Sequence, residues 1–211
     1  MEPAAAVFTP TLEPEDQARA DFYALLARLY AAVPDDALLQ AIAAADALRV
    51  DEGHVEGEAL ARAWQTLIAA SAVVDTATAA AEYIDLFVGV GKSEVSPHAS
   101  AYERVPGRQP LVEVRAALAR LGLARRPGET MYEDHLTAVL ETMRVLITGA
   151  GAHGGPATLD RQREFFAAHI DAWVISCCDA IISNPIANYY KQVAQCTKAF
   201  MAIERDSFAI S

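Results

Sequence analysis

The sequence predicts an all-α, single-domain helical bundle, and three observations support that prediction. Apolar residues make up 53% of the 211 residues while aromatic residues make up only 8%, which is typical of a globular helical protein rather than a disordered one. Apolar side chains recur at spacings of three and four residues through most of the chain, as in an amphipathic helix. No segment shows the strict alternation of a β-strand. A chain of this length is long enough for one domain with a sizeable core.

The first part of the chain is expected to be a loose leader at residues 1–12, and the helical domain is expected to span residues 13–211. Pro14 suits the first turn of the first helix, and Pro34 with the two aspartates after it ends that helix and begins the second. Asp75 can cap the fourth helix. The four helices of this half are expected at about residues 13–32, 36–45, 56–73 and 76–87.

Residues 89–110 form the longest stretch without helical periodicity and contain six glycine or proline residues. Such a long loop in a compact domain is usually functional, and we expect it on the surface. Residues 149–156 are expected to be a flexible break, which could act as a hinge for exchanging helices between two copies. The chain is therefore expected to be a monomer or a helix-swapped dimer. The helices of the second half are expected at about residues 111–121, 132–148, 158–172, 173–183 and 187–207.

The chain is acidic, with a net charge of −11 from 28 acidic and 17 basic residues. Nucleic acids and anionic membrane surfaces are disfavoured as partners, because they bind clustered lysine and arginine. A basic partner segment would be attracted over a long range. The need for solubility alone also accounts for an acidic surface.

The sequence predicts a cytoplasmic protein without stable membrane insertion. Its N-terminal residues lack the basic and apolar regions of a secretory signal, and no continuous apolar run approaches ~18 residues. The arginine pair at 125–126 lies in the middle of the chain and cannot be an export address. Three cysteines, none in a C-x-x-C frame, are expected to be reduced and mostly buried. They are Cys177, Cys178 and Cys196.

No catalytic or metal-binding pattern is present in the sequence. The five histidines are dispersed, and neither H-E-x-x-H nor paired E-x-x-H frames occur, so the usual ligands of a metal site in a helical bundle are missing. No nucleophile stands near a base. We therefore expect a protein that is not an enzyme and that holds no metal or other cofactor.

Residues 89–93, Gly-Val-Gly-Lys-Ser, look like the end of a phosphate-binding P-loop. A P-loop needs a further glycine upstream, with four residues between it and the Gly-Lys-Ser triplet, and Leu86 stands at that position. It also needs a preceding strand and a following helix, whereas the upstream segment is alanine-rich and Pro97 follows too soon for a long helix. A guanine-nucleotide-binding or hydrolysing protein that uses this loop is therefore the alternative hypothesis.

Five short motifs follow one another along most of the chain. They are Arg19-x-x-x-Tyr23-x-x-Leu26-x-x-Leu29-Tyr30 followed by Pro34-Asp35, Glu82-Tyr83-x-x-Leu86-Phe87 with Gly89-x-Gly91, Pro97-x-x-Ser100-x-Tyr102-Glu103, Glu133-Asp134-His135-Leu136 with Leu140-Glu141-x-Met143, and Phe165-Phe166-x-x-His169-Ile170-x-x-Trp173. No single motif is specific. In this order, however, they resemble the TorD/DmsD/NarJ family of cytoplasmic chaperones for molybdenum-cofactor oxidoreductases.

The resemblance implies an all-helical domain without chemistry of its own. Such a domain binds the twin-arginine signal peptide, or the apo form, of a molybdopterin-containing oxidoreductase catalytic subunit and delays its export until the cofactor is inserted. The implied clients are sulfoxide or N-oxide reductases, nitrate reductases and formate dehydrogenases. Val90 stands where the family often has proline, and His98-Ala99 where it often has a second proline or tryptophan. These departures bear on the identity of the client.

A signal peptide offers two arginines and an apolar stretch, so its receptor needs an apolar groove, an acidic rim and a flexible loop. Three apolar residues of the second motif could wall the groove. Glu82, Asp85, Glu103 and Asp134 could face the arginines, because carboxylates pair bidentately with guanidinium. The candidate client-binding residues are Tyr83, Leu86, Phe87, Gly89, Gly91, Pro97, Ser100, Tyr102, Asp134 and His135.

Several of these residues also have a purely structural interpretation. Leu86 and Phe87 lie on an apolar stripe of the kind that normally packs inward. Asp134 precedes a helix and could cap it or interact with its dipole, and His135 could form a hydrogen bond within the core. The sequence leaves these interpretations open.

Overall fold

The computed structural model describes residues 12–50, 53–89, 91–103, 106–126, 128–149 and 155–210. The expected leader, apart from Leu12, and the centre of the expected hinge lie outside these residues. Within them every regular element is helical, and the only β-type pairing is an isolated bridge between His98 and His135. The prediction of an all-α bundle is confirmed.

The helices follow the predicted order, and most boundaries agree within a few residues. The α-helices are α1 (Pro14–Ala31), α2 (Asp36–Ala43), α3 (Val55–Val73), α4 (Thr76–Tyr83), α5 (Pro110–Arg120), α6 (Leu136–Thr148), α7 (Leu159–Phe166), α8 (Val174–Ser183) and α9 (Tyr189–Ile210). Two π-helical turns continue α4 and α7, and one 3-10 turn lies within the predicted long loop. These turns are η1 (Ile84–Val88), η3 (Ala167–Asp171) and η2 (Ala99–Ala101).

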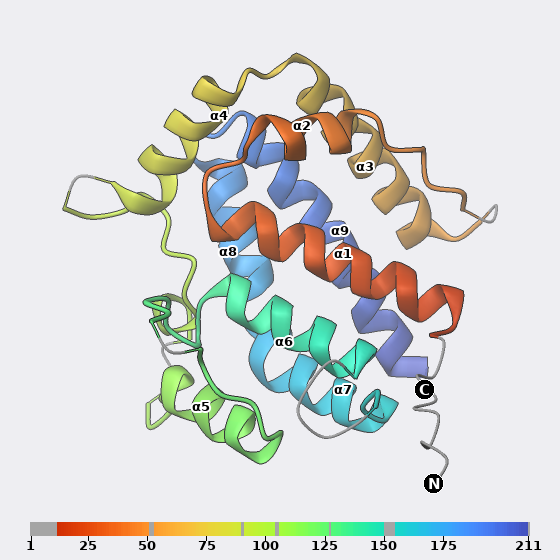
Figure 1. Cartoon of the computed structure of the whole chain (residues 1–211), viewed down its shortest axis with the longest axis vertical. Coiled ribbons are helices and arrows are strands. Elements are labelled where there is room, and N and C mark those ends of the chain that lie inside the picture. Colours follow the sequence, from red (N-terminus) through yellow and green to blue (C-terminus); the bar gives the residue numbers. More distant parts are fainter. Residues whose placement is uncertain are drawn as a thin grey trace, which may run out of the picture.

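The core forms where the long helices meet. α1 lies along α6, α9 packs against both α3 and α8, and α2 covers α3 (Figure 1). α5 lies at the lower left edge of the molecule in Figure 1, between two irregular connections. The largest fully buried side chains come from both ends of the sequence and include Tyr23, Tyr30, Trp173 and Tyr190.

Local sequence explains where most helices begin. Asp35 accepts the Leu38 N–H at 2.8 Å and caps α2, while Asp75 accepts the Thr78 N–H at 2.8 Å and caps α4. A side-chain oxygen at this position satisfies one of the free N–H groups of the first turn. α1 and α5 instead carry proline in the first turn, where the missing N–H is not needed.

The start of α6 differs from the prediction. The helix was expected from residue 132, but it begins at Leu136, because His135 has an extended backbone and acts as its N-cap. Nδ1 of His135 accepts the Thr137 N–H at 3.1 Å. The Leu136 N–H donates to the Pro97 carbonyl at 2.8 Å, so the segment before α6 pairs with the long loop instead of extending the helix.

A buried polar cluster joins α1 to α9. Glu204 is 1% exposed and accepts hydrogen bonds from Arg19 Nε at 2.7 Å and Nη2 at 2.9 Å, and from the Tyr23 hydroxyl at 2.9 Å. Burial, reinforced by the Glu204 carboxylate, raises the pKa of Tyr23, so its hydroxyl stays protonated and donates. At the other end of α9, the Tyr190 hydroxyl donates to the Leu29 carbonyl at 3.0 Å. The first motif therefore holds the first and last helices together.

Among the described residues, one helical stretch is long and apolar enough to cross a membrane. It is the run Leu159–Ser183, with a mean hydropathy of 1.6 in its most apolar window. The sequence of this stretch contains no continuous apolar run of that length, because polar residues interrupt it. Half of that window is buried inside the bundle, and core helices meet the same criteria, so this run is weak evidence for a span. Val55–Val73 with Thr76–Val88 qualifies only as a pair bent by 117°.

Candidate functional site

The first group of predicted site residues lies inside the bundle. Leu86 is 0% exposed, and the Tyr83 hydroxyl donates to the Tyr30 carbonyl at 3.2 Å. The Phe87 ring, which is half-buried, meets the Tyr83 ring edge-on at 5.2 Å and the Tyr190 ring at 5.1 Å. Such edge-to-face pairs stabilise a core beyond simple burial. Tyr83, Leu86 and Phe87 thus form the packed base from which the long loop departs.

Glu82, expected to face a client arginine, is instead buried and fully engaged. Its carboxylate accepts three backbone N–H groups at the start of α9, from Asn188 at 2.9 Å, Tyr189 at 3.0 Å and Tyr190 at 2.7 Å. These are N–H groups of a helix N-terminus, which have no partner within the helix. The rim assignment of Glu82 is therefore wrong, whereas Asp85, one turn away, is exposed.

The two glycines that follow have different structural roles. Gly89 has φ of +65°, and its N–H donates to the Ile84 carbonyl at 2.7 Å, which ends η1. A Cβ atom on Gly89 would lie 2.2 Å from the Lys92 carbonyl oxygen. Gly91 has φ of +89°, but a Cβ atom there would meet nothing within 4 Å. Packing and backbone both require glycine at the first position, and the backbone alone favours it at the second.

The surroundings of Gly89 do not match a P-loop. The residues before it are helical rather than extended, and the next helical turn, η2, has only three residues and begins at Ala99. In the described part of this segment no helix N-terminus faces Lys92 or Ser93. The strand–loop–helix context that phosphate binding needs is therefore missing here.

The second group of predicted residues comes together where the long loop meets the start of α6. The Ala99 N–H donates to the Asp134 carbonyl at 3.0 Å, and the Ser100 N–H donates to the Asp134 carboxylate at 3.3 Å. The other carboxylate oxygen lies 3.2 Å from Nδ1 of His98. The His98 and His135 rings meet edge-on at 4.8 Å. Buried Pro97 adjoins this contact through its carbonyl, which accepts the N–H of the first α6 residue. Motifs more than 30 residues apart thus form one contact.

The electrostatics of this contact favour a charged Asp134 and a neutral His135. Asp134 is 2% exposed, and burial alone would raise its pKa, but the hydrogen bonds from His98 and Ser100 outweigh burial and lower it. Burial, followed by the nearby charge of His98, lowers the pKa of His135 to about 4. At neutral pH the ring nitrogen of His135 therefore keeps the lone pair that caps α6.

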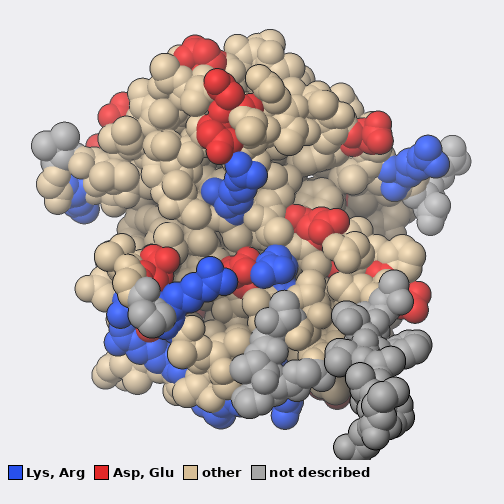
Figure 2. Space-filling model, viewed as in Figure 1, with Lys and Arg blue, Asp and Glu red and all other residues tan. Residues whose placement is uncertain are grey.

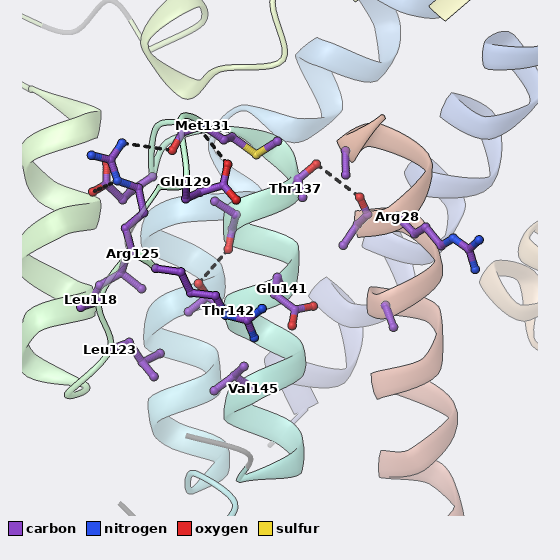
Figure 3. A pocket seen from close by; sticks show the side chains of 17 residues that line it. Arg28, Leu118, Leu123, Arg125, Glu129, Met131, Thr137, Glu141, Thr142 and Val145 are labelled. Carbon is purple, nitrogen blue, oxygen red and sulfur yellow. Dashed lines mark hydrogen bonds and ion pairs between the residues drawn. The ribbon is translucent and has the colours of Figure 1, made fainter. Parts of the chain in front are cut away.

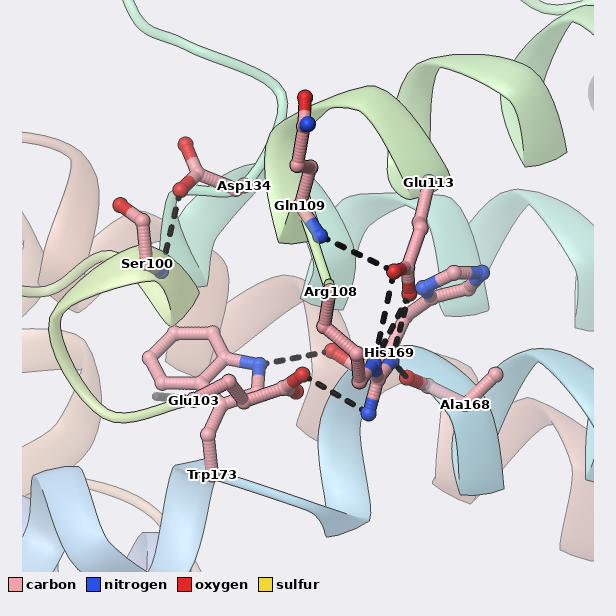
Figure 4. A network of polar contacts seen from close by, with 9 residues as sticks. All are labelled: Ser100, Glu103, Arg108, Gln109, Glu113, Asp134, Ala168, His169 and Trp173. Carbon is pink, nitrogen blue, oxygen red and sulfur yellow. Dashed lines mark hydrogen bonds and ion pairs between the residues drawn. The ribbon is translucent and has the colours of Figure 1, made fainter. Parts of the chain in front are cut away.

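Tyr102 and Glu103 connect the loop to the last motif. The Tyr102 ring stacks on Trp173 with centroids 5.9 Å apart, and the Trp173 indole donates to the His169 carbonyl at 2.8 Å. Arg108 bridges Glu103 at 2.9 Å and Glu113 at 2.6 Å (Figure 4). Burial raises the pKa of Glu103, although the Arg108 charge opposes that effect. Glu103 is therefore held by the chain's own arginine.

A groove between α1, α6 and the connection after α5 was not predicted (Figure 3). Its volume is about 560 Å³. Small and apolar side chains form its floor, and three carboxylates and three guanidiniums lie along it. The floor includes Ala27, Leu118, Leu123, Ala138 and Val145; the charged residues are Glu129, Glu133, Glu141, Arg28, Arg125 and Arg126.

Two of the groove carboxylates hold arginines of this chain in partly exposed ion pairs. Glu133 lies 2.9 Å from Nε of Arg115 and 4.0 Å from Nε of Arg125, and Glu141 lies 2.6 Å from Nη2 of Arg144. Glu133 belongs to the first part of the fourth motif, and Glu141, on α6, belongs to its second part. These two residues were the only part of the groove that the sequence motifs indicated. The alanines of α1 that line the groove did not indicate it in the sequence, because small residues are common on any packed helix.

The described residues contain no cluster of three or more His, Cys, Asp or Glu side chains that could hold a metal ion. Cys177, Cys178 and Cys196 are buried and free, as predicted. Burial raises the pKa of Cys177 and Cys196 to about 12, so both thiols stay protonated at neutral pH.

Comparison with known proteins identifies two similarities. Residues 55–179 match the family model of the nitrate reductase delta subunit. The chain is also 24% identical over 204 residues to the chaperone protein TorD of Shewanella loihica, in an alignment that covers 90% of this chain and 93% of that protein. The family match extends from α3 into α8 and includes the long loop, α5 and α6.

Proposed function

Because this chain belongs to the nitrate reductase delta subunit family, which includes the TorD-type chaperones, we propose that it is a chaperone specific to one molybdoenzyme. Its client is the apo catalytic subunit of a molybdopterin-containing oxidoreductase. It binds the client's twin-arginine signal peptide and delays export until the cofactor is inserted. The chain contributes binding rather than catalysis. A TorD-like match over most of both chains supports the chaperone class.

The groove between α1 and α6 is the observation that supports peptide binding. It combines an apolar floor with Glu129, Glu133 and Glu141 along its length. A signal peptide brings an apolar stretch and two guanidiniums, and these groups are complementary to such a groove. The acidic net charge of −11 would also attract a basic segment from a distance.

An arginine of the client can bind a groove carboxylate even though that carboxylate is already ion-paired within this chain. Glu133 is 13% exposed beside Arg115 at 45%, so that pair is partly buried. The pair of Glu141 with Arg144 is the more open one, with side chains that are 45% and 29% exposed. Ion pairs this open to water contribute about 1 kcal/mol or less. A client guanidinium can therefore replace or join the chain's own arginine at little cost in free energy.

The ten candidate residues then act mainly by positioning the long loop and α6. Asp134 and His135 fix the turn that carries Glu133 and Thr137 into the groove, and the Thr137 hydroxyl donates to the Ala27 carbonyl on α1 at 3.3 Å. Ser100 and Gly91 are exposed, and Tyr102 is half-buried. Phe87 and Gly89 are half-buried as well, so these five members of the set are the ones accessible for direct contact with the client.

The affinity should be moderate. Apolar burial contributes roughly 25 cal/mol per Å², from which the ordering of a flexible peptide subtracts. Partly exposed ion pairs add about 1 kcal/mol each at low salt. A dissociation constant on the order of micromolar follows, which suits a chaperone that must release its client.

The test is calorimetric titration with the signal peptide of the genuine client. Glu133→Gln and Glu141→Gln should each weaken binding about fivefold at low salt, and less at high salt. Glu58→Gln is the matched control, because Glu58 is an exposed, ion-paired glutamate on α3 that does not line the groove. Replacing both peptide arginines by glutamine should remove most of the salt dependence.

The outcomes separate the parts of the proposal. If no twin-arginine peptide binds, signal-peptide recognition is wrong, and tight binding of GTP in a parallel titration would favour the nucleotide alternative at residues 89–93. If the peptide binds equally well to the groove variants and to Glu58→Gln, recognition stands but the groove is not its site.

A further inference from the structure

A second cavity lies on the other side of α5, facing α7 and η3, and the proposed chaperone function does not use it. Its volume is about 690 Å³, within the range of small-molecule sites. Ala117 and Leu121 come from α5 and Phe165 from α7, and they form an apolar wall.

Two arginines face this cavity from opposite helices without partners. Arg120 ends α5 and Arg161 lies on α7, and neither has an ion pair or side-chain hydrogen bond within the described residues. Arg49 and Arg126 also have no ion pair in the described part of the chain, whereas nine other arginines are ion-paired. They are Arg19, Arg28, Arg62, Arg108, Arg115, Arg125, Arg144, Arg163 and Arg205.

The imidazole of His169 provides a further donor. His169 is 8% exposed and lines the cavity, and its ring nitrogens have no hydrogen-bond partner within the described part of the chain. Its neighbours are the Phe165 ring at 5.0 Å and the charges of Glu113, Arg108 and Arg120. Figure 4 shows the ring beside Glu113 and Arg108, which are already paired with each other.

The local charge favours an anion even though the whole chain is acidic. Residues 106–126 contain five arginines and one glutamate; of these arginines only Arg120 lines the cavity, and Arg108, Arg115 and Arg125 are paired with carboxylates. Figure 2 shows lysine and arginine gathered at the lower left, where Figure 1 places α5. Glu164 is the one carboxylate that lines the cavity, so the two guanidiniums leave a net positive charge there.

We propose that this cavity binds a small organic phosphate ester. Two guanidiniums from different helices and one imidazole line the same cavity, and together they offer enough hydrogen-bond donors for the three terminal oxygens of a phosphate, one more oxygen than a carboxylate has. The apolar wall of Phe165 and Leu121 would cover the organic part of the ligand. None of the residues that line this cavity lines the groove between α1 and α6, so the proposed phosphate site does not depend on where the client binds.

The ligand should change the protonation of His169. In the free protein, burial lowers the pKa of His169, with Glu113 opposing that shift and Arg108 and Arg120 adding to it. A bound dianion would stabilise the imidazolium and raise the pKa. Nuclear magnetic resonance of the histidine side chains, with His169→Gln used for assignment, would measure this shift directly.

The test uses phenyl phosphate as the probe, with inorganic phosphate and benzoate as comparison ligands. Phenyl phosphate should bind at least about fivefold more tightly than either, because only it has both the phosphate and an apolar ring. Arg120→Gln and Arg161→Gln should each weaken its binding about fivefold or more. Arg62→Gln is the matched control, since it removes one exposed positive charge from α3, far from the cavity lining.

Four results would overturn the proposal. They are the absence of saturable binding, equal weakening by Arg62→Gln, a phenyl phosphate affinity no higher than that of inorganic phosphate, and a benzoate affinity as high as that of phenyl phosphate. The exposed positions of both arginines make unfolding of these variants unexpected, and circular dichroism checks it.

Discussion

A single carboxylate, that of Glu82, connects two helices that are more than 100 residues apart in sequence. It accepts the N–H groups of Asn188, Tyr189 and Tyr190, and no other side chain in the described part caps that end of α9. At this scale, side chains that the sequence suggests for recognition turn out to stabilise the fold.

Glu82→Ala should therefore destabilise the protein by about 2–3 kcal/mol, because three buried N–H groups lose their acceptor. Urea unfolding monitored by circular dichroism measures the change. Asp85→Ala, in the next turn and exposed, is the control and should change stability by about 0.5 kcal/mol or less. Equal effects of the two substitutions would show that the Glu82 contacts contribute little.

His135 should make stability depend on pH. Its pKa is about 4 in the folded protein and about 6.5 when unfolded. The unfolded state therefore binds more protons between these values, and stability falls as pH drops from about 6.5 to about 4. The loss reaches on the order of 3 kcal/mol. The lowered pKa of His169 acts in the same direction, whereas that of Asp134 matters only below its unfolded value of 3.8.

His135→Asn should flatten this part of the pH profile, because asparagine can still cap α6 but does not titrate. Urea midpoints at pH 7 and pH 4.5 measure the difference. His54→Asn is the matched control, since His54 also caps a helix through Nδ1 but is exposed. A profile that is as steep in His135→Asn as in the unchanged chain would contradict the assignment.

At the scale of elements, the long loop is defined by how it leaves η1 and how it attaches to α6. Both Gly89 and Gly91 have positive φ. Only at Gly89 is the backbone of the following loop residues, at Lys92, so close that a Cβ atom would collide with it. The attachment to α6 combines two backbone hydrogen bonds with the carboxylate of Asp134. The loop is thereby fixed at its start and at its middle by contacts that its own residues make.

Gly89→Ala should destabilise the protein more than Gly91→Ala. Both substitutions place a side chain at positive φ, which lowers the free energy of unfolding by about 1 kcal/mol. Only Gly89→Ala also drives a Cβ atom to 2.2 Å from the Lys92 carbonyl, so that the loop must shift. Thermal unfolding of the two variants side by side measures the difference, and equal midpoints would mean that the loop yields without loss of stability.

Lys92→Ala should leave client maturation nearly intact. Lys92 is exposed, and the described residues around it lack the helix N-terminus that a P-loop needs. Activity of the client enzyme in cells that carry the variant is the measurement. Loss of maturation together with loss of tight magnesium-nucleotide binding would restore the P-loop hypothesis.

The sequence predicted the elements better than it predicted the sites. Apolar periodicity, Asp35, Asp75 and the two first-turn prolines are local signals, so the helices and the long loop could be located from them. The role of Glu82 and the groove could not be predicted, because they arise where helices far apart in sequence meet. The start of α6 was misjudged because the ring cap of His135 has no common sequence signature.

At the scale of the whole molecule, charge is unevenly distributed. The chain carries a net charge of −11, yet residues 106–126 carry an excess of four arginines. The groove proposed for the client and the cavity proposed for a phosphate ester lie on different sides of α5. One helix could therefore serve partners of opposite charge.

The rate of peptide association should reflect the acidic surface. The association rate of a twin-arginine peptide should fall about tenfold between ~20 mM and ~200 mM salt, because salt screens long-range attraction. Stopped-flow fluorescence measures it. A peptide with glutamine in place of both arginines is the control and should respond less. Equal salt dependence of the two peptides would show that steering by the arginines is absent.

The contacts of α9 also determine when this domain can finish folding as a ribosome produces it. Glu204 holds Arg19 and Tyr23 of α1, and the backbone at the start of α9 occupies Glu82 of α4. Until residues 189–210 have left the ribosome, these earlier side chains lack their partners. The nascent chain must therefore remain incompletely packed, and open to degradation, until translation has passed this helix.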